Sequence, residues 1–380
     1  MTLRLSTTAF FSRKGMLHRS RFSAATAVSS RRVFSAHGAG AGGDNAELEE
    51  KKAKINSAWN NSAEGYVGNI MDKGKVETGF SDPMVTINMS VGHKLVTRIV
   101  ADVSNKAYLK ESGSPVVLDI ASAGGEPAIT IAKAIPTASV HATDFAPAMT
   151  DHIRRRVGQA GVSNVTAGVA DGEALTEFSD ASVDAVTCTW GLIFMPQWQK
   201  AVQEFSRVLK KNGVVAVTLW EKSEDSILAR FNDVLETLVP GYEGVVDPET
   251  LGEDGGSAVA EEMKTAGLRD VSVTEFSVPV TLSPRGRPGD IWEFFTLSSP
   301  MGQTMSTLEE KGRKNVRQEA MEIFESRMAE DWEKGLEPLG LQPFGDGVGR
   351  DAGSSSSLEV SQSPRVIYVR ALLVTGRKIC

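Results

Sequence analysis

The chain has only two cysteines among its 380 residues, and they stand far apart, at Cys188 and Cys380. This spacing excludes a disulfide framework and a cysteine metal site. Cys188 lies in an apolar segment, so we expect it to be a small core residue rather than a nucleophile. The sequence also lacks an apolar run long enough to span a bilayer. Its 41% hydrophobic and 23% charged residues are typical of a folded globular chain.

Acidic residues are absent from the first 43 positions, and the first one is Asp44. The same segment holds seven arginines and lysines together with many serines and alanines, which is the composition of a transit peptide. Residues 32–36 resemble a mitochondrial processing site with an arginine shortly before the cut. We therefore expect residues 1–43 to be a disordered mitochondrial transit peptide. The alternatives are a plastid transit peptide and a basic tail with a different function.

Without that segment the chain keeps 34 basic and 48 acidic residues, a net charge of about −14. A protein of this charge is repelled by phosphate backbones, so nucleic acid is disfavoured as a substrate. Anionic membrane surfaces are disfavoured for the same reason. The sequence thus favours a small molecule as the partner, and it leaves the oligomeric state open.

Four strand-like segments end in polar or small residues, and helix-like sequence separates them. The four segments are 116–120, 139–144, 164–170 and 183–189. This alternation predicts an α/β fold with a doubly wound, Rossmann-like parallel sheet. In such sheets ligands bind outside the carboxyl ends of the strands, near the point where the strand order reverses. We therefore expect the four strand ends to share one crevice.

The sequence beyond residue 196 predicts further elements of the same domain. An amphipathic helix at 197–211 should end at Asn212-Gly213, before a strand at 214–220. We then expect helices at 226–238 and 258–266, a strand at 271–280, and a helical insertion at 288–328. Residues 329–363 hold few bulky apolar side chains, which predicts a disordered loop. Strand character returns at 365–375.

A nicotinamide dinucleotide is one ligand to consider for the crevice, because this architecture often binds it through a G-x-G-x-x-G loop. Here Ala121 and Ala123 occupy the first two glycine positions, and Glu126 occupies the third. The Glu126 carboxylate would repel a pyrophosphate at the helix N-terminus. The sequence therefore disfavours this ligand.

Five segments, in this order, carry a family resemblance: LDIASAGGEPA from residue 118, HATDFAPAM from 141, ADGEAL from 170, TWGLIFMP from 189 and EFSRVLKKNGVVAVTLW from 204. The order resembles class I S-adenosylmethionine-dependent methyltransferases. It is most similar to the branch that contains the ubiquinone/menaquinone C-methyltransferases. The resemblance covers about residues 115–220. It implies a seven-stranded sheet whose last strand is antiparallel, within a catalytic domain at 111–380 that follows a helical cap at 44–110.

The resemblance also implies how S-adenosylmethionine is held. The loop from Asp119 to Gly125 would wrap its amino-acid part, with Asp119 or Glu126 near the ammonium group. Asp144 would hold the ribose, and Asp171 with Gly172 would meet the adenine. The full set of implied cofactor residues is Asp119, Ala121, Ser122, Ala123, Gly124, Gly125, Asp144, Phe145, Met149, Asp171, Gly172 and Thr189.

The loop departs from the wider class, which has alternating glycines where this chain has Ala121 and Ala123. The alanine Cβ disfavours positive φ, so the loop must either turn with negative φ at both positions or accept strain. Gly124 also replaces a threonine that is common in this branch. Backbone amides stay available to a ligand.

For the methyl acceptor, the resemblance assigns a pocket beside the N-terminal cap. Trp59 and Tyr66 are our candidates there, because amphipathic aromatic side chains suit an organic ligand; core packing is the alternative. Trp190 and Phe194 belong to an apolar segment after the fourth strand. His93 is the one histidine that we consider as a general base. No metal is expected, since residues 189–199 lack the carboxylates of a catecholate–metal mechanism.

Two functions remain open at this level. The first is a mitochondrial methyltransferase that acts on carbon or oxygen of an aromatic, quinone-like or polyketide-like small molecule. The second is a non-catalytic binding or assembly role on the same fold, because fold alone does not determine function. The altered loop favours the second, whereas Asp144 and the Asp171-Gly172 pair favour the first.

Overall fold

The computed structural model describes residues 43–68, 85–87, 89–104, 114–221, 227–240, 250–252, 254–282, 288–297, 299–333 and 365–379. All of these except Gly43 belong to one compact unit, Asp44–Cys380. The expected transit peptide up to residue 42, and the part of the expected loop from 334 to 363, lie outside the described residues.

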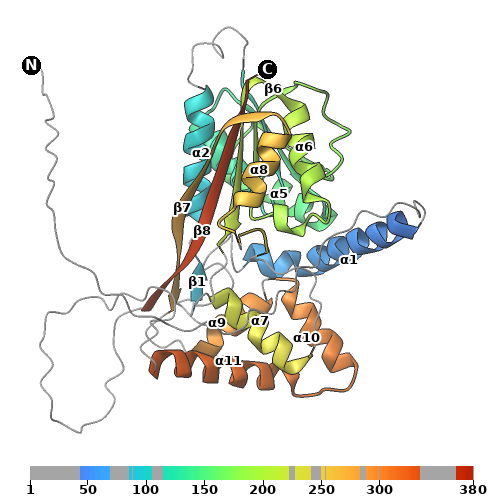
Figure 1. Cartoon of the computed structure of the whole chain (residues 1–380), viewed down its shortest axis with the longest axis vertical. Helices are drawn as coiled ribbons and strands as arrows, with labels where there is room; N and C mark the ends of the chain where they lie inside the picture. The colour runs from blue at the N-terminus through green and yellow to red at the C-terminus, as the bar shows by residue number, and fades with distance from the viewer. Residues whose placement is uncertain are drawn as a thin grey trace, which may run out of the picture. The chain divides into compact units, whose positions relative to one another are not determined.

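The described unit is built on a mixed sheet of eight strands in the order β1-β7-β8-β6-β5-β2-β3-β4 (Figure 1). Five parallel strands are β2 (Val116–Ile120), β3 (Ser139–Asp144), β4 (Val165–Val169), β5 (Val183–Thr189) and β6 (Leu209–Trp220). The last strand, β8 (Arg365–Lys378), runs antiparallel between β6 and β7 (Leu268–Leu282). The doubly wound sheet with an antiparallel last strand is therefore confirmed. The sequence did not predict β1 (Val85–Ile87), a short edge strand antiparallel to β7.

Helices cover both faces of the sheet, which is why its central strands are largely buried. All seven residues of β5 are buried. On one face lie α2 (Ser90–Ser104), α4 (Ala128–Ala134) and α5 (Pro147–Ala160). On the other lie α6 (Trp198–Val208) and α8 (Ser257–Thr265), over a core that contains Cys188. Cys188 is fully buried, as expected for a small core residue.

The boundary between α6 and β6 differs from the prediction. The helix ends at Val208, and Leu209 already pairs with Val183 of β5. The register then shifts, so that the next pair is Ala185 with Val214. Asn212 has a φ of 66° and turns the chain within this irregular stretch. The Asn-Gly pair thus marks a bulge inside a strand rather than the end of a helix, because burial of Leu209 favours the sheet.

A second helical layer packs beyond the end of β6. It comprises α7 (Ile227–Leu238), α9 (Pro288–Leu297), α10 (Met301–Glu310) and α11 (Val316–Glu333). Phe231 stacks on Trp292 and on Phe324 at centroid distances of 5.2 and 5.0 Å, and Trp220 at the end of β6 joins the same core. The helical insertion extends to Glu333, past the expected boundary at residue 328.

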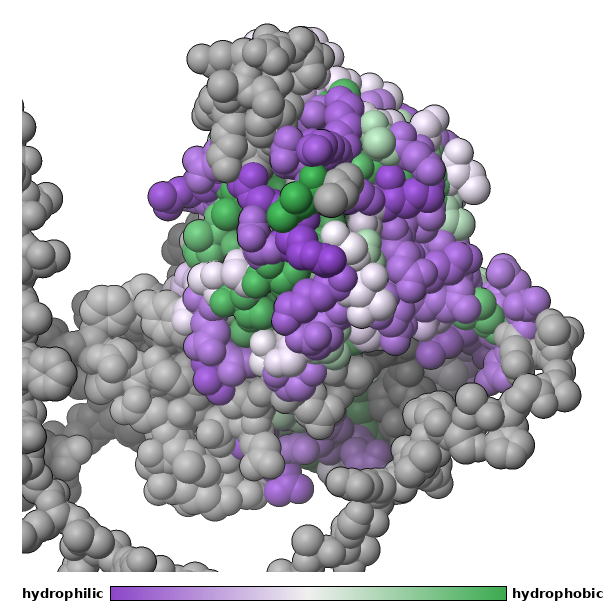
Figure 2. Space-filling model, turned by 45° about the horizontal axis from the view of Figure 1, so that its top comes forward, coloured by the Kyte–Doolittle hydropathy of each residue, from purple (hydrophilic) through white to green (hydrophobic). Residues whose placement is uncertain are grey.

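Helix α1 (Gly43–Tyr66) and the short helices η2 (Leu192–Phe194) and η3 (Thr250–Gly252) complete the described elements. Within the described ranges, no helix has the length and hydropathy needed to cross a membrane. Figure 2 shows a face on which hydrophobic residues lie in small groups among hydrophilic ones. The exposed large hydrophobic residues of the described chain are Val169, Val273, Leu297 and Ile379.

In the loop after β2, the two alanines adopt positive φ values and accept strain, rather than turning with negative φ. Ala121 and Ala123 have φ values of 54° and 48°, and Gly125 has 93°. Both alanines therefore adopt a left-handed φ, which glycine adopts without strain. Each such turn costs a non-glycine residue about 1–3 kcal/mol. The Asp144 carboxylate accepts a hydrogen bond from the Ala123 amide at 2.9 Å, which helps to hold the turn.

We predict that Ala123→Gly raises the free energy of unfolding by about 0.5–1 kcal/mol, because strain relief exceeds the added entropy of the unfolded chain. Urea unfolding followed by circular dichroism measures the change. The matched control is Ala53→Gly, at an exposed position inside α1, which should lower stability by about 1 kcal/mol. An equal decrease in the free energy of unfolding for both variants would show that the loop is unstrained.

Candidate functional site

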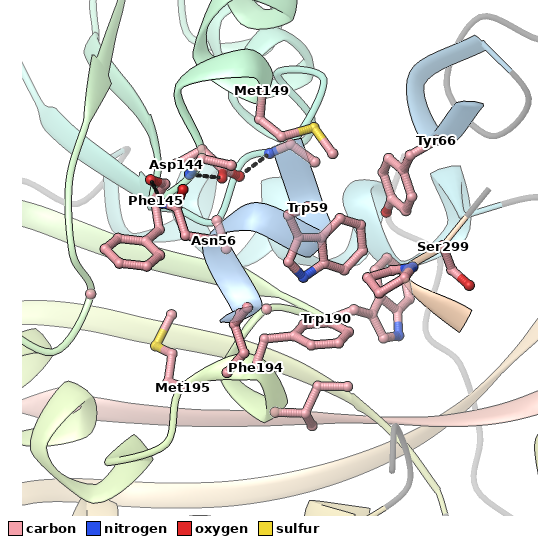
Figure 3. A pocket seen from close by; sticks show the side chains of 18 of the residues that line it. Asn56, Trp59, Tyr66, Asp144, Phe145, Met149, Trp190, Phe194, Met195 and Ser299 are labelled. Atoms are coloured by element: carbon pink, nitrogen blue, oxygen red, sulfur yellow. Dashed lines mark hydrogen bonds between the residues drawn. The ribbon is translucent and has the colours of Figure 1, made fainter. Parts of the chain in front are cut away.

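A cavity of about 410 Å³ opens at the carboxyl ends of the parallel strands (Figure 3). Its walls come from α1, from the loops after β2, β3, β4 and β5, and from α7 and the α9–α10 turn. The predicted site residues that line it are Trp59, Tyr66, Ala121, Ala123, Asp144, Phe145, Met149, Asp171, Gly172, Thr189, Trp190 and Phe194. The predicted residues absent from its lining are His93, Asp119, Ser122, Gly124 and Gly125.

Asp144, at the end of β3, fixes the geometry of one wall. Its two carboxylate oxygens accept hydrogen bonds of 2.9 Å each from the amides of Ala123 and Ala146. The side chain is 8% exposed, and burial raises the pKa of Asp144 to about 6, although the backbone amides partly offset this effect. Each oxygen has a second lone pair, so the carboxylate can still accept hydroxyl groups from a ligand.

Asp119 lies beneath the loop rather than facing the cavity, which differs from our expectation. It is fully buried, and its Oδ1 accepts a hydrogen bond of 2.6 Å from the Thr187 hydroxyl. Burial raises the pKa of Asp119 to about 7, while the hydroxyls of Ser122 and Thr187 oppose the rise. In this position the Asp119 carboxylate is held by Thr187 of β5 and does not line the cavity.

Glu126 is also directed away from the cavity. Its Oε2 accepts hydrogen bonds from the Thr130 amide and hydroxyl, at 3.1 and 2.6 Å. Arg156 of α5 donates a 2.6 Å hydrogen bond from Nε to the Gly124 carbonyl and lies 3.9 Å from Glu126. Gly124 and Glu126 therefore anchor the loop to α5, and the expected contact of Glu126 with a ligand is not supported.

The end of the cavity at β4 is a narrow slot. A Cβ on Gly172 would lie 2.8 Å from Cε at the end of the flexible Met195 side chain and 3.0 Å from Ile120 Cγ2, so a larger residue would narrow this end further. Phe145 and Met195 flank this end in Figure 3. A flat ring fits between such side chains, and neighbouring carboxylate and backbone groups can hydrogen-bond its edge.

Two carboxylates and one lysine meet at the same end. Lys52 of α1 places its Nζ 2.7 Å from Asp171 Oδ2 and 2.6 Å from Glu173 Oε2. Asp171 Oδ1 accepts from the Glu173 amide at 2.9 Å, and Glu173 Oε1 accepts from the Gln197 amide at 2.6 Å. Sequence reasoning missed Lys52 and Glu173. No local signal identifies Lys52, since its partner Asp171 is 119 positions away.

Helix α1 makes two further bonds to the site, through side chains that sequence reasoning also missed. Asn56 Nδ2 donates to the Phe145 carbonyl at 2.7 Å. Asn60 Oδ1 accepts from the Ala148 amide at 2.9 Å. These contacts hold one face of α1 over the end of β3 and the start of α5.

Aromatic side chains form the other end of the cavity. The Trp59 ring stands edge-on to Tyr66 and Phe194, at centroid distances of 5.3 and 4.9 Å. Trp190 stacks on Trp220 at 5.0 Å. Burial, assisted by the charge of Asp144, raises the pKa of Tyr66, so its hydroxyl stays protonated. Figure 3 shows Trp59, Tyr66, Trp190 and Phe194 gathered around one space.

His93 does not reach the cavity lining. It is 5% exposed, and its ring stands edge-on to Trp190 at 5.7 Å. Burial lowers the pKa of His93 to about 4. The expected general base is therefore a neutral side chain that packs behind Trp190. Among the described residues, no cluster of three or more His, Cys, Asp and Glu side chains could hold a metal ion.

Comparison with known proteins adds a family match. Residues 117–213 match the family model described as "Methyltransferase domain". The chain is 34% identical over 98 residues to the demethylmenaquinone methyltransferase of Deinococcus radiodurans, covering 26% of this chain and 39% of that one. It is 36% identical over 101 residues to the enzyme of the same name from Thermus thermophilus, covering 27% and 45%. The chain thus spans less than half the length of these relatives.

Among solved structures, the chain is similar to the YcgJ protein of Bacillus subtilis, with a TM-score of 0.45 and 18% identity over 75% of this chain and 98% of that one. A putative methyltransferase of Bacillus halodurans gives a TM-score of 0.44 and 18% identity over 75% and 99%. The family match runs from β2 to the start of β6 and includes the loops after β2, β3, β4 and β5 that line the cavity. Residues 117–213 thus match a methyltransferase domain, and over this part the chain is similar to S-adenosylmethionine-dependent methyltransferases.

Proposed function

We propose that this protein binds S-adenosylmethionine in the cavity and transfers its methyl group to carbon or oxygen of a small aromatic, quinone-like or polyketide-like acceptor. One observation carries the proposal. A single cavity joins the carboxylate Asp144 and the slot at Gly172 to a chamber of aromatic side chains. A nucleoside and an organic acceptor can therefore lie next to each other.

The residues fit S-adenosylmethionine from one end to the other. The Asp144 carboxylate can accept both ribose hydroxyls, and the slot between Phe145 and Met195 can take the adenine ring against Asp171. Ala121, Ala123 and Thr189 also line the cavity. The methionine end would lie there, held by backbone groups of the loop.

S-adenosylmethionine supplies a methyl group on a sulfonium, which is a good leaving group. The protein then has to align the acceptor with that methyl group and exclude water. Alignment of two reactants can contribute about 7–11 kcal/mol to catalysis, whereas a general base adds about 10²- to 10⁴-fold in rate. A mechanism that rests on positioning fits a site in which His93 is buried behind Trp190.

The acceptor chamber favours a neutral, planar ligand. Its lining is mostly apolar, and the polar side chains there are Asn232, Glu236 and Ser299. The apolar side chains are Trp59, Tyr66, Ile87, Met89, Trp190, Trp220, Leu235 and Phe295. Aromatic walls suit aromatic and quinone-like rings. Two of the relatives are named for methyl transfer to demethylmenaquinone, which supports the same class of acceptor.

The alternative, a binding or assembly role without catalysis, rests on the alanines of the loop. Ala121 and Ala123 nevertheless keep positive φ values, so the loop retains a glycine-like course. Cofactor binding without methyl transfer would favour this alternative.

For either role we propose a mitochondrial or plastid location, supported by the basic, acid-free composition of residues 1–43.

We predict that the protein binds S-adenosylhomocysteine with micromolar affinity and that Asp144→Ala weakens binding about 100-fold. The ribose hydroxyls then lose a charged acceptor, and each such hydrogen bond contributes about 1.5–3 kcal/mol. Isothermal titration calorimetry measures both affinities. The matched control is Asp151→Ala, whose side chain is 75% exposed on α5 and should leave the affinity unchanged. Equal affinities in all three proteins would refute the proposed ribose site.

Affinity should depend on pH through Asp144, whose pKa lies at about 6 in the unliganded protein. The ionised carboxylate accepts both hydroxyls, whereas the protonated form loses acceptor capacity. Affinity for S-adenosylhomocysteine should therefore be full above about pH 7 and fall as the pH drops through about 6. Calorimetry from about pH 5 to 8 tests this. Asp144→Asn, which cannot ionise, should bind weakly with no step near pH 6, and a step of equal size in that variant would assign it to another group.

Methyl transfer itself is tested with tritiated S-adenosylmethionine and a panel of naphthohydroquinones and phenols. We expect a hydroquinone to be methylated and Trp59→Ala to lower kcat/KM by about 10- to 100-fold, because Trp59 forms one wall of the chamber. Ser57→Ala, at an exposed position of the same helix, is the control. Cofactor binding without transfer to any member of the panel would favour the non-catalytic role.

A further inference from the structure

Lys52 is the one cationic side chain among the described residues that line the cavity. It reaches from α1 to the loop after β4, where its ammonium group contacts both Asp171 and Glu173. The Lys52 side chain is 11% exposed, and that of Glu173 only 1%. This is therefore an ion pair at the cavity wall rather than a surface contact. The pair of Lys54 with Glu50, on the same helix, is about 70% exposed.

The charge balance of this cluster depends on Lys52. Two carboxylates lie on either side of Gly172, and both contact the one ammonium group. Burial disfavours the charged lysine, but the hydrogen bonds to Asp171 and Glu173 outweigh this effect and raise the pKa of Lys52. Removing the ammonium would leave two partly buried carboxylates without a counter-ion, which is strongly unfavourable.

Helix α1 contacts both ends of the cavity. Lys52 and Asn56 bind the nucleoside end, whereas Trp59 and Tyr66 form a wall of the acceptor chamber. Lys52 and Trp59 are two helical turns apart, a rise of about 10 Å, so a rigid helix carries a displacement at one end to the other. The position of the aromatic wall thus depends on how α1 is fastened to the loop after β4.

We propose that Lys52 is a positioning residue that couples the two ligand sites: it fastens α1 over the bound nucleoside and thereby places Trp59 and Tyr66 for the acceptor. This inference rests on the proposed function. Adenine bound beside Asp171 and Gly172 shields the ion pair from water and strengthens it. Cofactor binding then orders α1, and the acceptor binds to the completed chamber. By linkage, a loosened α1 weakens the retention of the cofactor as well.

The test uses the full chain with S-adenosylhomocysteine as the probe. Stopped-flow displacement, followed by tryptophan fluorescence, gives the dissociation rate, and hydrogen exchange reports amide protection across residues 43–66. We expect Lys52→Met to raise the dissociation rate about 10- to 100-fold and to abolish the gain in protection that the probe gives α1. Lys52→Arg should restore both readouts, because it keeps the charge, and the control Lys54→Met should match the wild-type protein.

Thermal unfolding identifies any variant that fails to fold, and Lys52→Gln repeats the test if Lys52→Met does so. A wild-type dissociation rate in the folded, uncharged variant would overturn the coupling. Tighter binding in that variant would also overturn it, since the ammonium would then compete with the ligand. Absence of binding in the wild-type protein would instead refute the proposed function, so the two failures are distinguishable.

Discussion

The carboxylate of Asp144 joins the two strand ends on which the site depends. One oxygen holds the amide of Ala123 in the loop after β2, and the other holds the amide of Ala146 at the start of α5. The first bond stabilises a turn that alanine disfavours, because Ala123 has a positive φ. Below the loop, Asp119 is bound by Thr187 of β5, the strand on the other side of β2. These bonds fix the cavity wall beside β2, where the strand order reverses.

Around this wall the fold separates polar from aromatic surface within one cavity. The end of β3 and the loop after β4 supply the carboxylates of Asp144, Asp171 and Glu173, whereas the loop after β5, the end of β6 and the helical layer supply most of the aromatic side chains. Helix α1 crosses both regions, with Lys52 and Asn56 at the first and Trp59 at the second. A donor and an acceptor of different chemistry can therefore meet where the regions join. The same arrangement explains why the α1 side chains matter to both ligands.

The sequence predicted the parts of this structure that depend on local pattern. Strand-like runs that end in polar residues predicted β3 at 139–144 and β5 at 183–189, both of which the structure confirms, and the motif order predicted the methyltransferase domain that matches residues 117–213. It could not predict contacts between distant segments, such as Lys52 with Asp171. It also misjudged Asn212-Gly213, because pairing of Leu209 with Val183 overrides the helix-end signal. His93 carries the chemistry of a base, but only the packing of α2 against Trp190 shows that it is buried.

The most direct test of the account is a crystal structure of the protein with S-adenosylhomocysteine. We predict that both ribose hydroxyls lie within hydrogen-bonding distance of the Asp144 carboxylate, with the adenine ring between Phe145 and Met195 and its edge at Asp171. The thioether sulfur should point toward the chamber formed by Trp59 and Trp190. A ligand bound elsewhere on the protein, or bound in this cavity with its ribose away from Asp144, would contradict the account.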